Sequence, residues 1–181
     1  MIMFELSEIE ELANQVNLSS LYEKAKKSAQ IGNDILKVNY KKIQKISSKG
    51  RKGDLVTNVD LEVENKIKEY LIEETPTISI NAEESGKLAK SSDFTWCIDP
   101  LDGTTNYSHG YPFFGTSIGL IYKNKPILGA ISVPYFNELY SACIGLGSFC
   151  NDSELKVSNP TNLSESLLVT GFSYDRLRQR I

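Results

Sequence analysis

The 181-residue sequence has little of several residue types on which common protein sites depend. Its single histidine leaves little material for a Ser-His-Asp triad or a multi-histidine metal site. Its three cysteines form no Cys-x-x-Cys pair, which argues against a zinc site or a disulfide framework and indicates buried thiols in a reducing compartment. No apolar run is long enough to span a membrane, and the acidic start lacks the pattern of a signal peptide. We therefore expect a cytoplasmic protein.

No charge of either sign dominates, because the formal net charge is only −3. The basic run over 37–52 is broken up by Ile and Ser, so we interpret it as a solvated face and expect no nucleic-acid partner. Hydrophobic residues make up 40% and charged residues 24%, the composition of a globular protein. This length is typical of one domain, so residues 1–181 are expected to form a single domain.

Two helices are predicted in the first half of the chain. The first forty residues have helical spacing of their apolar positions, with Ser19 or Ser20 as a suitable N-cap. A capping box of Thr57 and Asp60 begins a second helix, which should end before Pro76. Between the helices, 41–50 indicates a short strand and 50–54 a turn or mobile loop.

Strand-like runs follow and are separated by turn chemistry such as 145–153. They cover 77–81, 95–99, 116–122, 127–133, 138–144 and 167–170. Helices first and strands afterwards predict an α+β protein, with helices packed on a mostly antiparallel sheet. Tyr107, Tyr111, Phe113 and Phe114 form an aromatic cluster that we expect to pack in the core.

The stretch WCIDPLDGTTN, which runs over 96–106, places two aspartates at the end of an apolar strand. Pro100 should end that strand at Asp99, and Gly103 permits a backbone conformation that a side chain would obstruct. If the 77–81 strand pairs beside it, Glu83 joins Asp99 and Asp102 at one sheet edge. Carboxylates and carbonyls are the ligands that Mg²⁺ prefers. The alternative is a simple turn, and Asp60 taken alone is more typical of a helix cap than of a catalytic group.

Spacing excludes two other readings of these aspartates. Phosphatases of the haloacid dehalogenase type need Asp-x-Asp, whereas Asp99 and Asp102 are three residues apart. An EF-hand loop that begins at Asp99 would need ligands where Leu101, Gly103 and Gly110 stand.

The same stretch resembles the signature of the inositol monophosphatase family, which comprises lithium-sensitive, Mg²⁺-dependent phosphatases. The segments DLVTNVD (54–60), AEES (82–85), FCNDSELKVS (149–158) and LLVTGF (167–172) resemble further elements of that family. The resemblance covers roughly 20–175. It implies the N-terminal part of the family's layered αβαβα fold, a small phosphorylated substrate and a homodimer.

The resemblance also implies roles for individual residues. Glu83, Asp99 and the Leu101 carbonyl would bind one Mg²⁺, and Asp99 and Asp102 would share a second. Gly103 and Thr104 would bind the substrate phosphate together with Asp102. Asp60, Thr104 and Glu83 would be the catalytic groups, with Asp60 paired to Thr104 to orient a metal-activated water that attacks phosphorus directly.

The family continues through a further α/β layer with a Trp-Asp-x-Ala-Ala-Gly segment, which this sequence does not contain. We therefore expect an open apolar sheet face, self-association and doubtful activity of the chain as it stands. The expected reaction is phosphomonoester hydrolysis, with inositol monophosphate as the first substrate. Histidinol phosphate, 3′,5′-bisphosphonucleotides and fructose 1,6-bisphosphate remain as alternative substrates. The competing interpretation is a truncated, non-catalytic remnant that binds metal or a partner.

Overall fold

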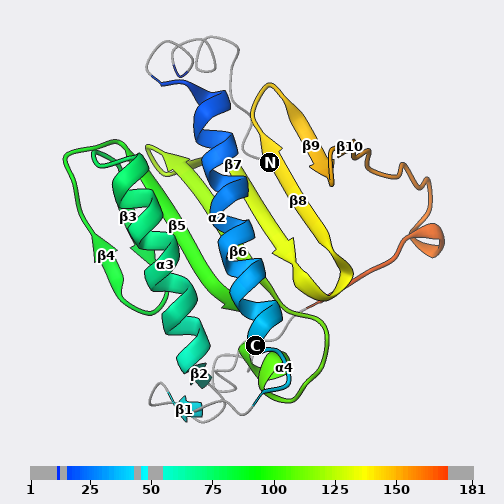
Figure 1. Ribbon diagram of the computed structural model, residues 1–181. Helices are drawn as coiled ribbons and strands as arrows, with labels where there is room; N and C mark the ends of the chain where they lie inside the picture. Colours follow the sequence, from blue (N-terminus) through cyan, green and yellow to red (C-terminus); the bar gives the residue numbers. More distant parts are fainter. Residues whose placement is uncertain (1–11, 13–15, 43–45, 49–54, 171–181) are drawn as a thin grey trace, which may run out of the picture.

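Two long helices lie side by side on one face of a twisted eight-stranded sheet (Figure 1). The fold is taken from a computed structural model, which describes residues 12, 16–42, 46–48 and 55–170. The helices are α2 (Leu18–Asn39) and α3 (Asn58–Glu74), with a short α4 (Thr104–Ser108). The sheet strands are β3 (Ser79–Ala82), β4 (Gly86–Leu88), β5 (Phe94–Asp102), β6 (Gly115–Tyr122), β7 (Lys125–Val133), β8 (Glu138–Cys143), β9 (Gly147–Cys150) and β10 (Ser153–Glu154).

The order of the sheet is β10-β9-β8-β7-β6-β5-β3-β4. Every neighbouring pair is antiparallel except β3 and β5, which are parallel. The predicted α+β class and mostly antiparallel sheet are therefore confirmed. A separate two-stranded sheet joins β1 (Ile46–Ser48) to β2 (Leu55–Thr57), so part of the strand predicted over 41–50 is present. The loop predicted over 50–54 lies outside the described residues.

Helix α2 begins one turn earlier than the sequence suggested. Asn17, and not Ser19 or Ser20, is its N-cap, because the Asn17 side chain accepts the Ser20 N–H at 3.0 Å. The apolar positions Leu21, Ala25 and Ala29 are buried as their spacing predicted.

Helix α3 begins at the predicted capping box. Thr57 is its N-cap and accepts the Val59 and Asp60 N–H groups, while Asp60 accepts the Thr57 N–H in return. The helix ends at Glu74, before Pro76. Its apolar stripe, formed by Val59, Val63, Ile67 and Leu71, is fully buried against the sheet.

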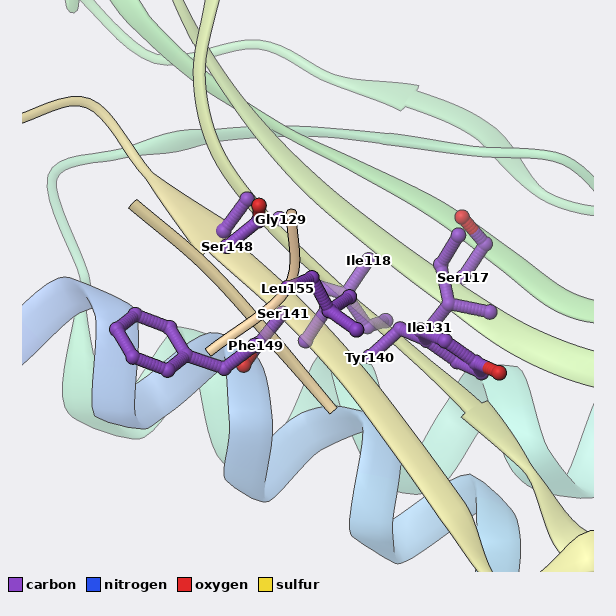
Figure 2. Close-up of a pocket in the computed structure, with 11 residues that line it drawn as sticks. Ser117, Ile118, Gly129, Ile131, Tyr140, Ser141, Ser148, Phe149 and Leu155 are labelled. Carbon is purple, nitrogen blue, oxygen red and sulfur yellow. The ribbon is translucent and has the colours of Figure 1, made fainter. Parts of the chain in front are cut away.

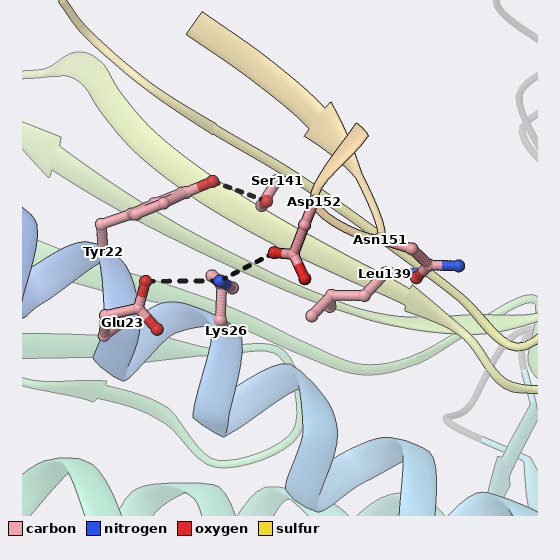
Figure 3. Close-up of polar contacts among 7 residues, drawn as sticks. All are labelled: Tyr22, Glu23, Lys26, Leu139, Ser141, Asn151 and Asp152. Atoms are coloured by element: carbon pink, nitrogen blue, oxygen red, sulfur yellow. Dashed lines mark hydrogen bonds and ion pairs between the residues drawn. The ribbon is translucent and has the colours of Figure 1, made fainter. Parts of the chain in front are cut away.

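The core lies between the two helices and the sheet. At its centre is Trp96, which is fully buried and donates its indole N–H to the Thr75 hydroxyl at 3.0 Å. Truncating a side chain of this size in a core costs about 3–5 kcal/mol. Polar contacts also hold α2 on the sheet: the Tyr22 and Ser141 hydroxyls lie 2.7 Å apart, and Lys26 pairs with Asp152 at 3.6 Å (Figure 3).

Besides the N-cap of α2, four further local predictions were wrong. Strand β5 continues past Pro100 to Asp102, because a bulge between Asp99 and Asp102 accommodates the proline. The turn predicted over 145–153 contains β9, which pairs with β8. Residues 167–170 form no strand in the structure, where they lie exposed and without a neighbouring strand to pair with. Of the aromatic cluster, Tyr107 and Phe114 are buried, whereas Tyr111 and Phe113 are about 60% exposed.

Among the described residues, no helix packs on the sheet face opposite α2 and α3. A row of small residues crosses five strands there in register: Cys97, Gly119, Gly129, Ala142 and Ser148. Beside the row is a largely apolar pocket of about 320 Å³, lined in part by Ile131, Tyr140 and Phe149 (Figure 2). Ile131 is 45% exposed. This is the open apolar face that the resemblance implied.

Within the described ranges, no helix is long and apolar enough to cross a membrane.

Candidate metal and phosphate site

Strands β3 and β5 are neighbours and pair in parallel, which is the condition on which Glu83 was expected to join the aspartates. Ala82 at the end of β3 lies opposite Ile98, and the Glu83 N–H donates to the Ile98 carbonyl at 3.0 Å. Glu83 therefore lies next to Asp99 on the neighbouring strand. The two carboxyl groups are close enough to interact, because both the charge of Glu83 and a hydrogen bond with it raise the pKa of Asp99.

Asp99 is the most perturbed carboxyl group of the site. Burial, the negative charge of Glu83, a hydrogen bond with Glu83 and the charge of Asp102 together raise the pKa of Asp99 from 3.8 to about 7. The Leu101 N–H opposes the shift by stabilising the carboxylate. The Asp99 Oδ1 atom is buried and accepts no hydrogen bond from any residue that the structure describes. A crowded carboxyl with an unpartnered oxygen is suited to a cation.

The bulge in β5 contains Leu101 and ends at Asp102, the next two predicted site residues. Asp102 lies opposite Gly115 and is exposed, whereas the Leu101 side chain is buried. The Thr116 hydroxyl donates to the Pro100 carbonyl at 2.9 Å, which fixes the bulge from the neighbouring strand. The structure thus places Leu101 and Asp102 just beyond Asp99.

Gly103 adopts the left-handed conformation, with φ 87° and ψ 36°, and leads into α4. A Cβ atom at this position would lie 3.0 Å from the Phe113 carbonyl oxygen and 3.4 Å from Phe114 Cα. Both the backbone angle and the close neighbours therefore require glycine, as its place in the sequence indicated.

Asp60 reaches the same loop from the start of α3. The Thr104 hydroxyl lies 3.2 Å from Asp60 Oδ1 and 3.0 Å from the Leu101 carbonyl oxygen. A hydroxyl has one proton, so Thr104 can donate fully to only one of these two acceptors at a time. Burial raises the pKa of Asp60, while its hydrogen bonds with Thr57 and Thr104 counteract this effect. Asp60 is thus both a helix cap and a neighbour of the site.

Glu64 was not predicted from the sequence. This residue is only 2% exposed, and its carboxylate accepts the Glu84 N–H at 2.7 Å and the Ser85 N–H at 3.0 Å. The available signal was its position one turn after Asp60, between the apolar positions Val63 and Ile67, where a charged residue needs a buried partner.

A pocket of about 330 Å³ adjoins the carboxylates on the open side of the sheet. Its lining includes Glu83, Asp99, Cys97 and Ser117. Cys97 forms no disulfide, and neither do the other two cysteines. In the described part of the chain, no three His, Cys, Asp or Glu side chains gather closely enough to hold a metal ion by themselves. Mg²⁺ does not require such a cage, since it usually takes one or two carboxylates and keeps several waters.

Residues 17–180 match the sequence pattern that defines the inositol monophosphatase family. Among curated proteins, an inositol-1-monophosphatase of Synechocystis sp. is 46% identical over 138 residues, which are 76% of this chain and 48% of the relative. A fructose-1,6-bisphosphatase/inositol-1-monophosphatase of Aquifex aeolicus is 40% identical, over 86% of this chain and 60% of the relative. A Nus factor SuhB of Pasteurella multocida is 42% identical over 126 residues.

The solved structure of an inositol monophosphatase from Anabaena (Nostoc) sp. superposes with a TM-score of 0.78 and 39% identity. The match covers 90% of this chain and 59% of that one. The chain thus spans about half to three fifths of the length of these relatives. Within that span, the family pattern and the superposed fold agree. The chain belongs to the inositol monophosphatase family.

Proposed function

We propose that this chain provides the metal- and phosphate-binding part of an Mg²⁺-dependent phosphomonoesterase that acts on a small phosphorylated alcohol, inositol monophosphate first. The observation that carries the proposal is the Asp99 carboxyl: it contacts Glu83, and its Oδ1 atom is buried without a hydrogen bond from the described residues. Family membership supports a phosphatase.

Glu83, Asp99 and the Leu101 carbonyl would hold one Mg²⁺, and Asp99 and Asp102 would share a second. When bound, Mg²⁺ lowers the pKa of water near phosphorus and neutralises charge on the phosphoryl group. The crowded carboxyl groups gain from this arrangement, because a cation offsets the repulsion that raises the pKa of Asp99.

Thr104 and Asp60 would orient the attacking water. When the Leu101 carbonyl faces a cation, the Thr104 proton is left to Asp60 Oδ1, 3.2 Å away. The lone pairs of the Thr104 oxygen would then accept a hydrogen bond from a water and orient that water toward phosphorus. Attack is direct, so the chain needs no nucleophilic Ser, Cys or His. Glu83 is the third catalytic group, as a neighbour of the same water.

The backbone N–H groups of Gly103 and Thr104, with Asp102 beside them, would hold the phosphate. The left-handed Gly103 turns the chain there, and Asn106 donates a hydrogen bond to the Phe113 carbonyl at 2.7 Å, which ties the segment to the neighbouring chain. Backbone donors that are fixed in advance stabilise a phosphoryl group without reorganising during the reaction.

Two substrates for the test follow from the relatives, whose names include inositol-1-monophosphatase and fructose-1,6-bisphosphatase, and the other two are the alternatives implied by the family resemblance. Phosphate release should be measured on inositol 1-phosphate, histidinol phosphate, adenosine 3′,5′-bisphosphate and fructose 1,6-bisphosphate. Each assay includes Mg²⁺, with an arm that contains Li⁺. Turnover that needs Mg²⁺ and falls with Li⁺ supports the proposal, and the preferred ester identifies the substrate. The proposed setting is the cytoplasm, and the proposed assembly is a homodimer.

A second candidate is a non-catalytic protein that binds metal or a partner. The observations that favour it are the open apolar sheet face and the relative that is named a Nus factor. The same assay separates the two candidates. Mg²⁺ binding without release of phosphate from any ester in the panel would favour the non-catalytic protein.

A further inference from the structure

We propose that Glu64 is a positioning residue that holds the Glu83–Ser85 turn in register with the Asp99–Thr104 segment, which we call the aspartate loop. This inference rests on the proposed metal site. The residue does not touch the pocket. It acts from behind the turn, where its buried carboxylate accepts the backbone N–H groups of Glu84 at 2.7 Å and Ser85 at 3.0 Å.

This contact fixes the turn more firmly than a single hydrogen bond can. Each carboxylate oxygen accepts one of two successive N–H groups, Oε2 from Glu84 and Oε1 from Ser85, so the backbone after Glu83 can neither rotate nor slide without losing a bond. Hydrogen bonds to an ionised acceptor are stronger than neutral ones, and those of Glu64 are shielded because the residue is only 2% exposed.

The same helix face holds the opposite side of the site. Asp60 lies one turn before Glu64 on α3 and contacts Thr104 in the aspartate loop. Residues four apart share a helix face and lie about 6 Å apart along its axis. Strands β3 and β5 place the Glu83 turn and the Asp99–Thr104 segment on two separate strands. Because one rigid helix contacts both, α3 helps to set the spacing between them.

Lys68 completes the arrangement one turn further along. Its Nζ atom lies 4.0 Å from Glu64 Oε1 and donates to the Ser85 hydroxyl at 2.6 Å. It therefore offsets the charge of the buried Glu64 carboxylate and also binds the Glu83–Ser85 turn from the solvent side. A buried charge is tolerated where such partners compensate for its lost hydration.

The chemistry requires a carboxylate at position 64. Glutamine has one acceptor oxygen, and its NH₂ group would face one of the two N–H donors. Glu64→Gln therefore keeps the shape of the side chain and breaks one of the two bonds. Glu62→Gln is the matched control, since Glu62 is exposed on the same helix.

The test measures amide hydrogen exchange and calorimetric Mg²⁺ binding in the full chain, at a temperature where circular dichroism shows each variant folded. Glu64→Gln should accelerate exchange at Glu84 and Ser85 about tenfold and weaken Mg²⁺ binding about 10- to 100-fold. Glu62→Gln should change neither quantity. Unchanged exchange at both amides, or unchanged Mg²⁺ affinity, in folded Glu64→Gln would overturn the proposal.

Two further outcomes are decisive. If the unmodified chain gives no Mg²⁺ heat, the proposed metal site fails, whereas exchange at Glu84 and Ser85 still reports whether Glu64 holds the turn. If Glu64→Gln does not fold, Lys68→Met is used to test the proposal. This variant leaves the buried Glu64 carboxylate in place and removes the Lys68 hydrogen bond to the Ser85 hydroxyl. Faster exchange at Ser85 with weaker Mg²⁺ binding would support the positioning role, and no change in either would refute it.

Discussion

Asp60 Oδ1 and the Thr104 hydroxyl lie 3.2 Å apart, although 44 residues separate them in the sequence. The contact joins the first turn of α3 to the loop that follows β5. Asp60 also accepts the Thr57 N–H at 3.0 Å, so one carboxylate serves both the helix start and the candidate site. These two tasks can be separated by mutation.

Asp60→Asn should lower both stability and phosphate release, whereas Thr57→Ala should lower mainly stability. Loss of an N-cap interaction costs about 1 kcal/mol in the free energy of unfolding. Only Asp60→Asn removes the charged acceptor of the Thr104 proton. Urea unfolding and the phosphate-release assay measure the two effects. Equal losses of activity in both variants would argue that Asp60 acts only as a cap.

Gly103→Ala should destabilise the protein more than Gly86→Ala. Both glycines have positive φ, 87° and 76°, so each substitution carries the left-handed strain of about 1–2 kcal/mol. Only at Gly103 does the new Cβ also meet a backbone oxygen, at 3.0 Å, whereas nothing lies within 4 Å at Gly86. Thermal unfolding of the two variants gives the comparison. A smaller loss at Gly103 would show that the loop relaxes.

The metal-free protein should become less stable as the pH rises from about 4 to about 7. The pKa of Asp99 is raised from 3.8 to about 7, so the folded protein retains a proton that the unfolded chain has lost. Stability should therefore be highest below the unfolded pKa and lowest above pH 7. Mg²⁺ affinity should change in the opposite direction and fall as the pH drops below about 7, because protons compete for Asp99.

Thermal unfolding of wild type and Asp99→Asn, without metal and across this pH range, measures the effect. The asparagine variant has no crowded charge at this position, so the contribution of Asp99 to the pH dependence should be absent from it. Identical pH profiles for the two proteins would show that Asp99 is not the responsible group.

The open sheet face should drive self-association. Ile131 is 45% exposed beside the apolar pocket, and Ile131→Lys introduces a charge there. Val157→Lys is the control, because Val157 is 95% exposed and does not line that pocket. Sedimentation velocity at increasing concentration should show less association for Ile131→Lys alone. Equal association of both variants would place the contact elsewhere.

The periodic parts of the fold could be predicted from the sequence. The capping box of Thr57 and Asp60 and the apolar spacing of α3 depend on local chemistry, and both are present in the structure. The extension of β5 past Pro100 was missed because a bulge depends on the neighbouring strand, through Thr116 and Gly115. The strand predicted over 167–170 failed for a related reason, since a strand needs a partner.

In the candidate site, too, residues that depend on local sequence could be predicted, whereas those that depend on distant partners could not. Asp99, Asp102 and Gly103 occur in one short stretch, and Glu83 could be added on the assumption that two strands pair. The position of Glu64 between Val63 and Ile67 indicated that it is buried, but its partners could not be identified, because they are backbone N–H groups of a turn that is distant in the sequence. The resemblance implied an open apolar sheet face, but the row of small residues on that face could be identified only once the strand register was known.

The central claim is that Asp99 and Asp102 bind Mg²⁺. Calorimetric titration of Mg²⁺ into wild type, Asp99→Asn and Asp102→Asn at pH 8 tests it most directly, with Asp93→Asn as a control at the far end of β5, where the side chain is 63% exposed. We expect a saturable heat in wild type and in Asp93→Asn, a lost heat in Asp99→Asn and a reduced one in Asp102→Asn. Equal heats in all four proteins would contradict the metal site.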